Sequence, residues 1–324
     1  MDMATNHTEE FILSNDGAHK LHLETFEPTE QNIKICVQIS HGMIDFVGRY
    51  KRYAESLNAL GITVAGADHL GHGGSVNDKA EYGYFAKRGG VDLVLRDLKS
   101  VNDNLHSKYP DYKIVLLGHS MGSFLARLYA ERYPDSIDGL ILQGTSGPNP
   151  LLPVGRALVA LMKPIFGDKH RSYFVKGMAD GSYNNRFKGE MIDGVPNIGA
   201  WLTRDAEKVK MRPTDERTNY IFTISGYGDL FKMLWDCNKA SHYKALPKKL
   251  PIFMMSGADD PVGNFGKGVN KVYDSMKRAG ITDVRIKLYE GARHELFNEL
   301  CYDEVVNDTY AFLKDVAKPN GITE

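Results

Sequence analysis

From Lys113 to Tyr133 the sequence reads KIVLLGHSMGSFLARLYAERY, and this stretch decides the fold. The continuous apolar run Ile114–Leu117 is typical of a strand buried on both faces of a parallel sheet. A helical pattern starts at Met121 and stops at Pro134. Between them, the G-x-S-x-G string from Gly118 to Gly122 predicts a sharp strand-to-helix turn that presents the hydroxyl of Ser120.

The same strand and helix alternation extends in both directions from this turn. It predicts an α/β fold with a mostly parallel sheet, helices on both faces and an antiparallel hairpin at one edge. The expected hairpin strands are Glu10–Ser14 and Lys20–Phe26. The other expected strands are Ile33–Ile39, Ile62–Ala67, Tyr112–Leu117, Asp138–Gln143, Pro251–Ser256 and Val284–Tyr289. Helices are expected near 48–60, 91–109, 121–133, 265–279 and 295–317.

The alternation lapses after residue 147 for about a hundred residues, where prolines and glycines interrupt short helical patterns. We therefore expect a core formed by residues 1–147 and 246–324, with residues 148–245 inserted as a helical cap.

Composition excludes several classes of protein. The 324 residues include 40 Lys and Arg against 41 Asp and Glu, a net charge of −1, so no positive field attracts nucleic acid. The three cysteines are far apart, which indicates a reducing compartment and a cytoplasmic location. The N-terminus lacks the pattern of a secretory signal, and no segment has the apolar length of a membrane span.

A serine becomes a nucleophile when a base takes its proton, and in this type of fold the partners follow in the order Ser, acid, His. His294 lies just past the last expected strand, beyond every candidate acid. Asp259 and Asp260 both follow the strand Pro251–Met255, and by spacing alone either qualifies. We favour Asp260, because Pro261 holds its backbone extended.

Acyl transfer also needs an oxyanion hole. The backbone N–H of Met121, directly after Ser120, is one expected donor, and that of Met43, after the strand ending at Ile39, is the other. We expect His41 to brace this loop, Asp68 to serve a hydrogen-bond network, and His119 to pack beside the turn. His69 and His72 suggest a metal only weakly, because glycines fill that stretch. No metal or cofactor is expected.

Several strings together resemble the monoacylglycerol lipase and bacterial lysophospholipase branch of the α/β-hydrolases over nearly the whole chain. They are His41-Gly42-Met43, Gly48-Arg49-Tyr50, Asp68-His69-Leu70-Gly71-His72-Gly73-Gly74-Ser75, Gly118-His119-Ser120-Met121-Gly122, Asp260-Pro261-Val262 and Gly291-Ala292-Arg293-His294-Glu295. The resemblance implies an eight-stranded α/β-hydrolase sheet, a Ser120–Asp260–His294 triad, Met43 and Met121 as oxyanion donors, and a cap over an acyl pocket. Ser123 departs from the usual pattern, where a second glycine is common.

These observations predict a serine hydrolase that cleaves esters of lipid-like substrates such as monoacylglycerols or lysophospholipids. Two apolar groups of the cap could hold it to the core, or a subset of them could line an acyl tunnel or touch a membrane or micelle transiently. They are Leu151, Leu152, Val154, Leu158, Val159, Leu161, Met162, Ile165 and Phe166, and then Ile221, Phe222, Leu230, Phe231, Met233, Leu234 and Trp235.

Three alternatives stay open. One is a short-chain carboxylesterase or thioesterase, and another is a non-catalytic binding protein of the same fold. The third is an aminopeptidase, which would need an acidic cap pocket for a free amino terminus. Glu190, Asp193, Asp205, Glu207, Asp215 and Glu216 could supply that pocket. Dehalogenase and epoxide-hydrolase chemistry would place an aspartate where Ser120 stands.

Overall fold

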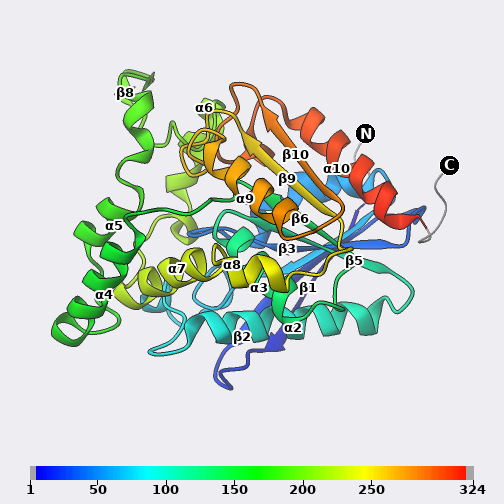
Figure 1. The fold of residues 1–324 in the computed structure, drawn as a ribbon, viewed down its shortest axis with the longest axis horizontal. Coiled ribbons are helices and arrows are strands. Elements are labelled where there is room, and N and C mark those ends of the chain that lie inside the picture. Colours follow the sequence, from blue (N-terminus) through cyan, green and yellow to red (C-terminus); the bar gives the residue numbers. More distant parts are fainter. Residues whose placement is uncertain (1–4, 319–324) are drawn as a thin grey trace.

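The central feature is a sheet whose strands have the order β1-β2-β4-β3-β5-β6-β9-β10, seen in a computed structural model that describes residues 5–318 (Figure 1). The strands are β1 (Asn6–Leu13), β2 (Lys20–Glu27), β3 (Ile35–Ser40), β4 (Thr63–Ala67), β5 (Lys113–His119), β6 (Gly139–Gln143), β9 (Ile252–Gly257) and β10 (Val284–Tyr289). From β4 to β10 all neighbours are parallel, whereas β1 and β2 form an antiparallel hairpin at one edge. The predicted eight-stranded, mostly parallel sheet is confirmed.

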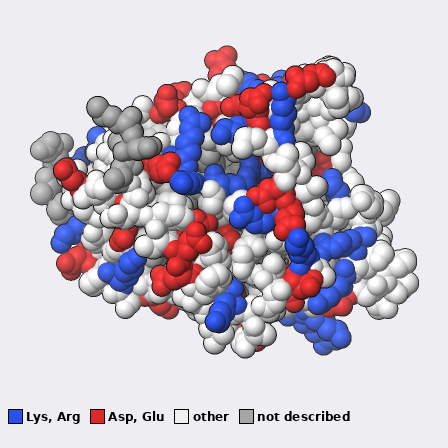
Figure 2. All heavy atoms as spheres, turned by 180° about the vertical axis from the view of Figure 1, so that it is seen from behind, with Lys and Arg blue, Asp and Glu red and all other residues white. Residues whose placement is uncertain are grey.

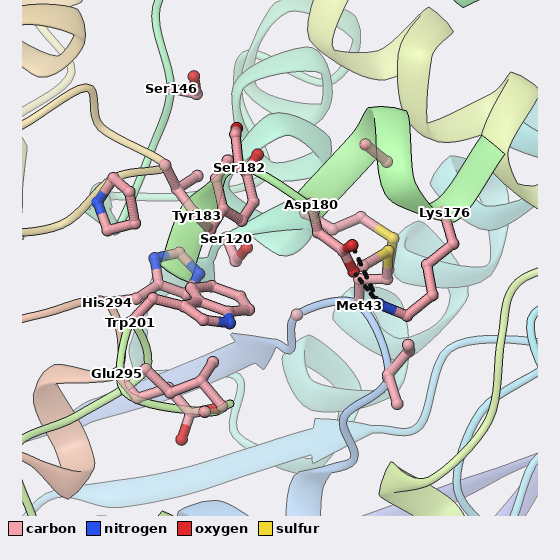
Figure 3. A pocket seen from close by; sticks show the side chains of 18 of the residues that line it. Met43, Ser120, Ser146, Lys176, Asp180, Ser182, Tyr183, Trp201, His294 and Glu295 are labelled. Atoms are coloured by element: carbon pink, nitrogen blue, oxygen red, sulfur yellow. Dashed lines mark hydrogen bonds and ion pairs between the residues drawn. The ribbon is translucent and has the colours of Figure 1, made fainter. Parts of the chain in front are cut away.

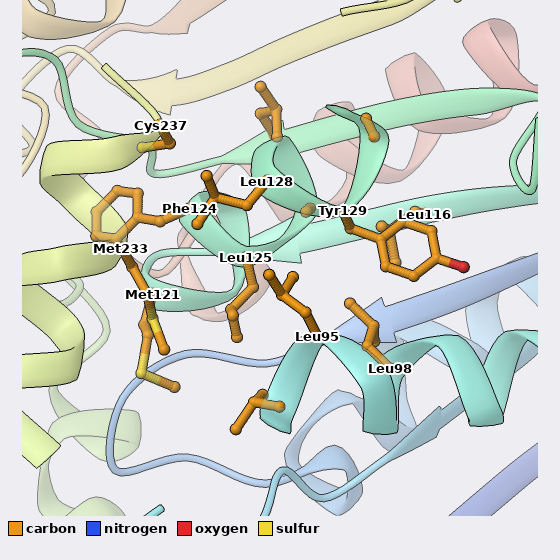
Figure 4. Close-up of a cluster of buried hydrophobic side chains, with 14 of the residues drawn as sticks. Leu95, Leu98, Leu116, Met121, Phe124, Leu125, Leu128, Tyr129, Met233 and Cys237 are labelled. Atoms are coloured by element: carbon orange, nitrogen blue, oxygen red, sulfur yellow. The ribbon is translucent and has the colours of Figure 1, made fainter. Parts of the chain in front are cut away.

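Alternating side chains of the central strands pack into two apolar layers, one on each face of the sheet. In β5, Ile114 and Leu116 point into the layer under α2 (Gly90–Lys108), α3 (Met121–Arg132) and α9 (Lys267–Arg278). Val115 and Leu117 point into the layer under α1 (Lys51–Asn58) and α10 (Tyr302–Ala317). Figure 4 shows the first layer, where Leu95 and Leu98 of α2 meet Leu125 of α3. Burial on both faces explains the unbroken apolar run in the sequence.

Residues between β6 and β9 leave the sheet and carry their own elements, drawn in green and yellow in Figure 1. They form α4 (Leu152–Phe166), α5 (Tyr173–Asp180), α6 (Ala206–Met211), α7 (Ile224–Asp236) and α8 (Ala240–Ala245). A short antiparallel pair, β7 (Met191–Ile192) and β8 (Val195–Pro196), was not anticipated from the sequence. We call residues 148–245 the inserted segment.

The last helix differs from its prediction. A single helix from residue 295 was expected, but α10 begins at Tyr302, after a short 3-10 turn at Leu296–Asn298. Glu295 and Glu299 lie on either side of this turn with non-helical ψ angles of 79° and 162°. Their carboxylates are held by Arg49 and by the backbone N–H of Arg293, respectively, so tertiary ion pairs and hydrogen bonds override the helical pattern.

The surface carries no dominant charge. Figure 2 shows basic and acidic side chains interspersed over one face of the molecule. Among residues 5–318, every helix is too short or too polar to cross a bilayer.

Asp229 joins the inserted segment to the core and makes stability depend on pH. It belongs to α7 and lies against Gly90 at the start of α2, where an added β-carbon would come 2.1 Å from Asp229 Oδ2. This oxygen is buried and finds no hydrogen-bond partner among the described residues. Burial raises the pKa of Asp229 to about 7, although Lys163 acts in the opposite direction.

Because this pKa exceeds the unfolded value, the folded protein binds more protons between about pH 4 and pH 7 and loses stability as pH rises through that range. We expect the free energy of unfolding of Asp229→Asn, relative to that of the wild type, to increase by on the order of 3 kcal/mol between about pH 4 and pH 8. Urea unfolding at both pH values measures the gain. The same difference in unfolding free energy between variant and wild type at both pH values would contradict the prediction.

Candidate active site

The turn between β5 and α3 holds Ser120 in a strained conformation, with φ 52° and ψ −118°. Two glycines make this possible. A β-carbon on Gly118 would lie 2.4 Å from the carbonyl oxygen of Gly122, and one on Gly122 would lie 1.9 Å from that of Ser40. Ser123 is accommodated, and its hydroxyl donates to the carbonyl of Ser120 at 2.6 Å. Positive φ at a non-glycine residue is costly and occurs preferentially at functional sites.

Asp260, which the sequence analysis favoured over Asp259, lies beside His294. Nδ1 of His294 is 3.0 Å from Asp260 Oδ2, and both residues are buried. The other carboxylate oxygen accepts the backbone N–H of Val262 at 2.8 Å, which fixes the plane of the carboxylate. Asp259 instead points to the inserted segment and pairs with Arg186 at 3.2 Å. The spacing alone could not separate the two aspartates, but the structure does.

Ser120, His294 and Trp201 line one cavity (Figure 3). Trp201, from the inserted segment, lies with its ring centroid 5.3 Å from that of His294, and its carbonyl accepts the His294 N–H at 3.3 Å. No hydrogen bond joins the side chains of Ser120 and His294, two residues within the described range. Such contacts are often long without substrate and shorten in the reacting complex.

The loop after β3 brings Gly42 next to Ser120, with an ideal Gly42 β-carbon 3.4 Å from Ser120 Cβ, and Met43 lines the same cavity. His41 braces the loop with both ring nitrogens: Nδ1–H donates to the Gly42 carbonyl at 2.9 Å, and Nε2 accepts the His69 N–H at 2.8 Å. This pairing leaves His41 no free nitrogen for proton transfer. Among the described residues no acceptor takes the Met43 N–H, and Met121 opens α3, where N–H groups lack intrahelical partners.

A buried charge network, which the sequence analysis did not identify, supports this loop. Arg49 bridges Asp45 and Glu295 at 2.7 Å each, and Arg212 of the inserted segment also pairs with Glu295. Arg212 donates as well to the carbonyl of Ile44, which has a positive φ of 54°. Burial opposes ionisation of Glu295, but Arg49 and Arg212 lower its pKa to about 2. Arg49 and Glu295 stand in the quoted strings, yet only the fold brings them together.

The remaining polar residues near the loop have structural contacts. Nε2 of His69 pairs with the Ser40 hydroxyl at 3.0 Å, and Nδ1–H of His72 donates to the Leu70 carbonyl at 3.2 Å. Asp68 accepts the N–H groups of Val47 and Gly74, so the predicted network is confirmed. His119 packs 4.9 Å from the His294 ring, and burial lowers its pKa to about 3, which keeps it neutral.

Above Ser120 opens a cavity of about 1290 Å³ lined by the core and the inserted segment. Of the apolar side chains singled out in the sequence, Leu151, Leu152, Val154, Leu230, Phe231 and Leu234 line it. Val159, Phe222 and Met233 are instead buried in the apolar layer against the core. Leu161, Ile165 and Phe166 are exposed to solvent. These apolar side chains therefore divide into three sets, which line the cavity, pack against the core or face solvent.

Each carboxylate that lines the cavity already has a cationic partner. The pairs are Asp45 with Arg49, Asp180 with Lys176, Asp193 with Lys210 and Glu295 with Arg212. The Lys176–Asp180 pair of α5 faces the cavity near Met43 (Figure 3). Of the acids considered for an amino-terminus pocket, Glu190 pairs with Arg293.

Comparisons with known proteins show which family the chain resembles. Residues 31–301 match the family Hydrolase_4, described as "Serine aminopeptidase, S33". The chain is 26% identical to the human monoglyceride lipase over 92% of this chain and 86% of that protein. It is 25% identical to the monoacylglycerol lipase of Mycolicibacterium smegmatis over 86% of this chain and 87% of that one.

The fold is also similar to that of a solved esterase structure. A thermostable carboxyl esterase from Bacillus coagulans, in complex with glycerol, superposes with a TM-score of 0.88 and 25% identity, covering 97% of this chain and 100% of that one. The family match spans most of the chain, and the relatives cover it nearly end to end. The protein thus belongs to the Hydrolase_4 family and is an α/β-hydrolase of the monoacylglycerol lipase family, a carboxylic ester hydrolase.

Proposed function

We propose that the protein hydrolyses carboxylic esters of lipid-like substrates, monoacylglycerols or lysophospholipids, through an acyl-enzyme on Ser120. The observation that carries the proposal is the large, mostly apolar cavity with Ser120 at its base. Its lining by Leu152, Leu230 and Phe231 suits an acyl chain, because burying each methylene contributes about 0.8 kcal/mol.

The proposed reaction begins when Ser120 Oγ attacks the ester carbonyl and His294 Nε2 takes the hydroxyl proton. Asp260 holds His294 through Nδ1–H and stabilises the imidazolium. The N–H groups of Met43 and Met121 bind the oxyanion, and one such donor is worth about 2.7–4 kcal/mol in other serine hydrolases. The tetrahedral intermediate collapses, His294 protonates the leaving alcohol, and water activated by His294 then releases the fatty acid and frees Ser120.

Residues 148–245 act as the cap in this proposal. Arg212 and Trp201 of the cap contact Glu295 and His294, respectively, so the position of the cap and the geometry of the site depend on each other. Lys176 and Asp180 are among the polar residues that line the cavity, and they could bind hydroxyl or headgroup oxygens of the leaving alcohol.

The aminopeptidase alternative fits this cavity less well. A free amino terminus is a cation and needs an unpaired carboxylate, whereas Asp45, Asp180, Asp193 and Glu295 are each paired. A neutral ester needs no such partner, so the family description as an aminopeptidase does not by itself set the substrate.

The test is hydrolysis of p-nitrophenyl esters from acetate to palmitate. We expect kcat/KM to rise by at least tenfold from acetate to octanoate or longer, because the added methylenes enter the apolar cavity. Aminoacyl-naphthylamides should not be turned over. A kcat/KM that is flat or falls with chain length would instead support a short-chain carboxylesterase, and naphthylamide turnover would support the aminopeptidase.

We further propose transient contact of the cap with membranes or micelles. Leu161, Ile165 and Phe166 of α4 and Tyr173 and Phe174 of α5 are exposed, and net charge gives no attraction to anionic lipid. In the same ester panel we expect a higher rate on substrate presented in neutral micelles than on monomeric substrate. Equal rates would contradict the contact.

A further inference from the structure

The hairpin of β1 and β2 forms one edge of the sheet (Figure 1). This edge carries a cluster of histidine and carboxylate side chains outside the candidate active site. The register places Glu9 directly opposite Glu24. Like charges opposite each other destabilise a strand pair, and the third carboxylate, Asp68 after β4, lies beside them. His7 and His22 occupy the diagonal positions on the same face.

The ligand atoms of this cluster converge closely. One ligand atom each from His22, Glu24 and Asp68 lie within 4.8 Å of one another, and the same holds for His7, Glu9 and Glu24. Nδ1 of His22 is 3.1 Å from Asp68 Oδ2. Two ligands of a tetrahedral zinc ion at about 2.0–2.1 Å are about 3.3 Å apart, so an ion could replace the proton of this hydrogen bond with little movement of the two side chains.

Each of the three central ligands is also oriented by a second partner. Nε2 of His22 pairs with Glu9 at 2.9 Å, which directs Nδ1 toward Glu24 and Asp68. Asp68 is held by backbone N–H groups at 2.7 and 2.8 Å, and Glu24 by His7 at 2.9 Å. Carboxylate–histidine pairs of this kind position the ligands of protein metal sites. Glu24 and Asp68 are 6% and 1% exposed, so their charges are poorly hydrated without an ion.

We propose that His22, Glu24 and Asp68 bind a divalent transition-metal ion of the zinc type, with Glu9 and His7 as outer partners. A mixed set of one imidazole and two carboxylates suits zinc better than magnesium or calcium, which prefer all-oxygen ligands. Asp68 precedes His69 in the sequence, but the fold places its carboxylate against His22 of β2.

The proposed ion would link the hairpin to the loop after β4. Asp68 starts that loop, and its carboxylate accepts the Gly74 N–H. The Ser75 hydroxyl donates to the Asp68 carbonyl and accepts the backbone N–H of His22. The same loop carries His69, which pairs with Ser40. Binding to the folded state alone raises thermal stability, so the role we assign to the ion is structural.

The test uses the full-length, tag-free protein stripped with EDTA and titrated with Zn²⁺. We expect one equivalent to bind and Tm to rise, with Mg²⁺ giving no rise. His22→Asn and Glu24→Gln should each weaken binding by at least a hundredfold, and the outer-partner variant Glu9→Gln by about tenfold. The matched control is His106→Asn, a histidine of α2 whose ring pairs with the Ser136 carbonyl and which should bind zinc normally.

Bound Co²⁺ provides a second readout, because its visible absorption reports coordination by protein ligands. This readout does not depend on Tm, so it can still be used if one variant has a low stability. The spectrum should appear in the wild type and in His106→Asn, and disappear in Glu24→Gln. Unchanged zinc affinity in both His22→Asn and Glu24→Gln, or no stoichiometric binding by the wild type, would overturn the proposal and leave a hydrogen-bonded cluster only.

Discussion

Ser120→Ala should lower kcat on the preferred ester by about 10⁶-fold while leaving the protein folded, as loss of the nucleophile does in other serine hydrolases. The physical reason is that, in the proposed cycle, Ser120 Oγ is the protein atom that forms the covalent bond to the acyl group before water releases it. Alanine fits the strained turn at least as well, because it removes one oxygen and keeps the β-carbon. The measurement is kcat for the octanoate ester, with Tm as the check of folding.

Covalent labelling separates the nucleophile from other serines of the cavity. A fluorophosphonate should modify the wild type once and fail to modify Ser120→Ala. Ser146 also lines the cavity, so Ser146→Ala is the matched control and should label at the wild-type rate. Activity that survives in Ser120→Ala, or a label found on Ser146, would contradict the assignment.

Asp260→Asn should lower kcat by about 10⁴-fold, because an amide in this place can donate to Nδ1 and hold His294 in the wrong tautomer. The substitution keeps the volume of the buried side chain. An amide oxygen can still accept the Val262 N–H that Asp260 Oδ1 accepts at 2.8 Å. KM should therefore change little, and the loss should appear in kcat. Steady-state kinetics on the octanoate ester measure both constants.

Asp259→Asn is the control for this prediction, because it changes the same chemical group one residue away. Asp259 is partly exposed and pairs with Arg186, and such surface pairs contribute about 0–1 kcal/mol. We expect its kcat to stay within twofold of the wild type. A large loss in Asp259→Asn with near-normal kcat in Asp260→Asn would reverse the assignment of the acid.

Much of the architecture follows from local pattern. The run Ile114–Leu117 is buried on both faces, and its alternating side chains enter two separate apolar layers. Gly118 and Gly122 mark the turn because a β-carbon at either would collide with backbone. These features are short-range, so periodicity and glycine placement reveal them. By contrast, the apolar pattern after Glu295 predicted one continuous helix, but a short 3-10 turn at Leu296–Asn298 precedes α10, and the distant Arg49 holds the Glu295 carboxylate.

The mostly parallel sheet, the strained turn at Ser120 and a histidine after the last strand can be predicted from the sequence, because each depends on neighbours along the chain. The three-dimensional fold was needed to show which aspartate meets His294, that Arg212 reaches Glu295, and that His22, Glu24 and Asp68 converge. The reason is physical: these contacts join residues far apart in sequence. Their geometry is set by sheet register and by packing of the inserted segment, neither of which leaves a periodic signal.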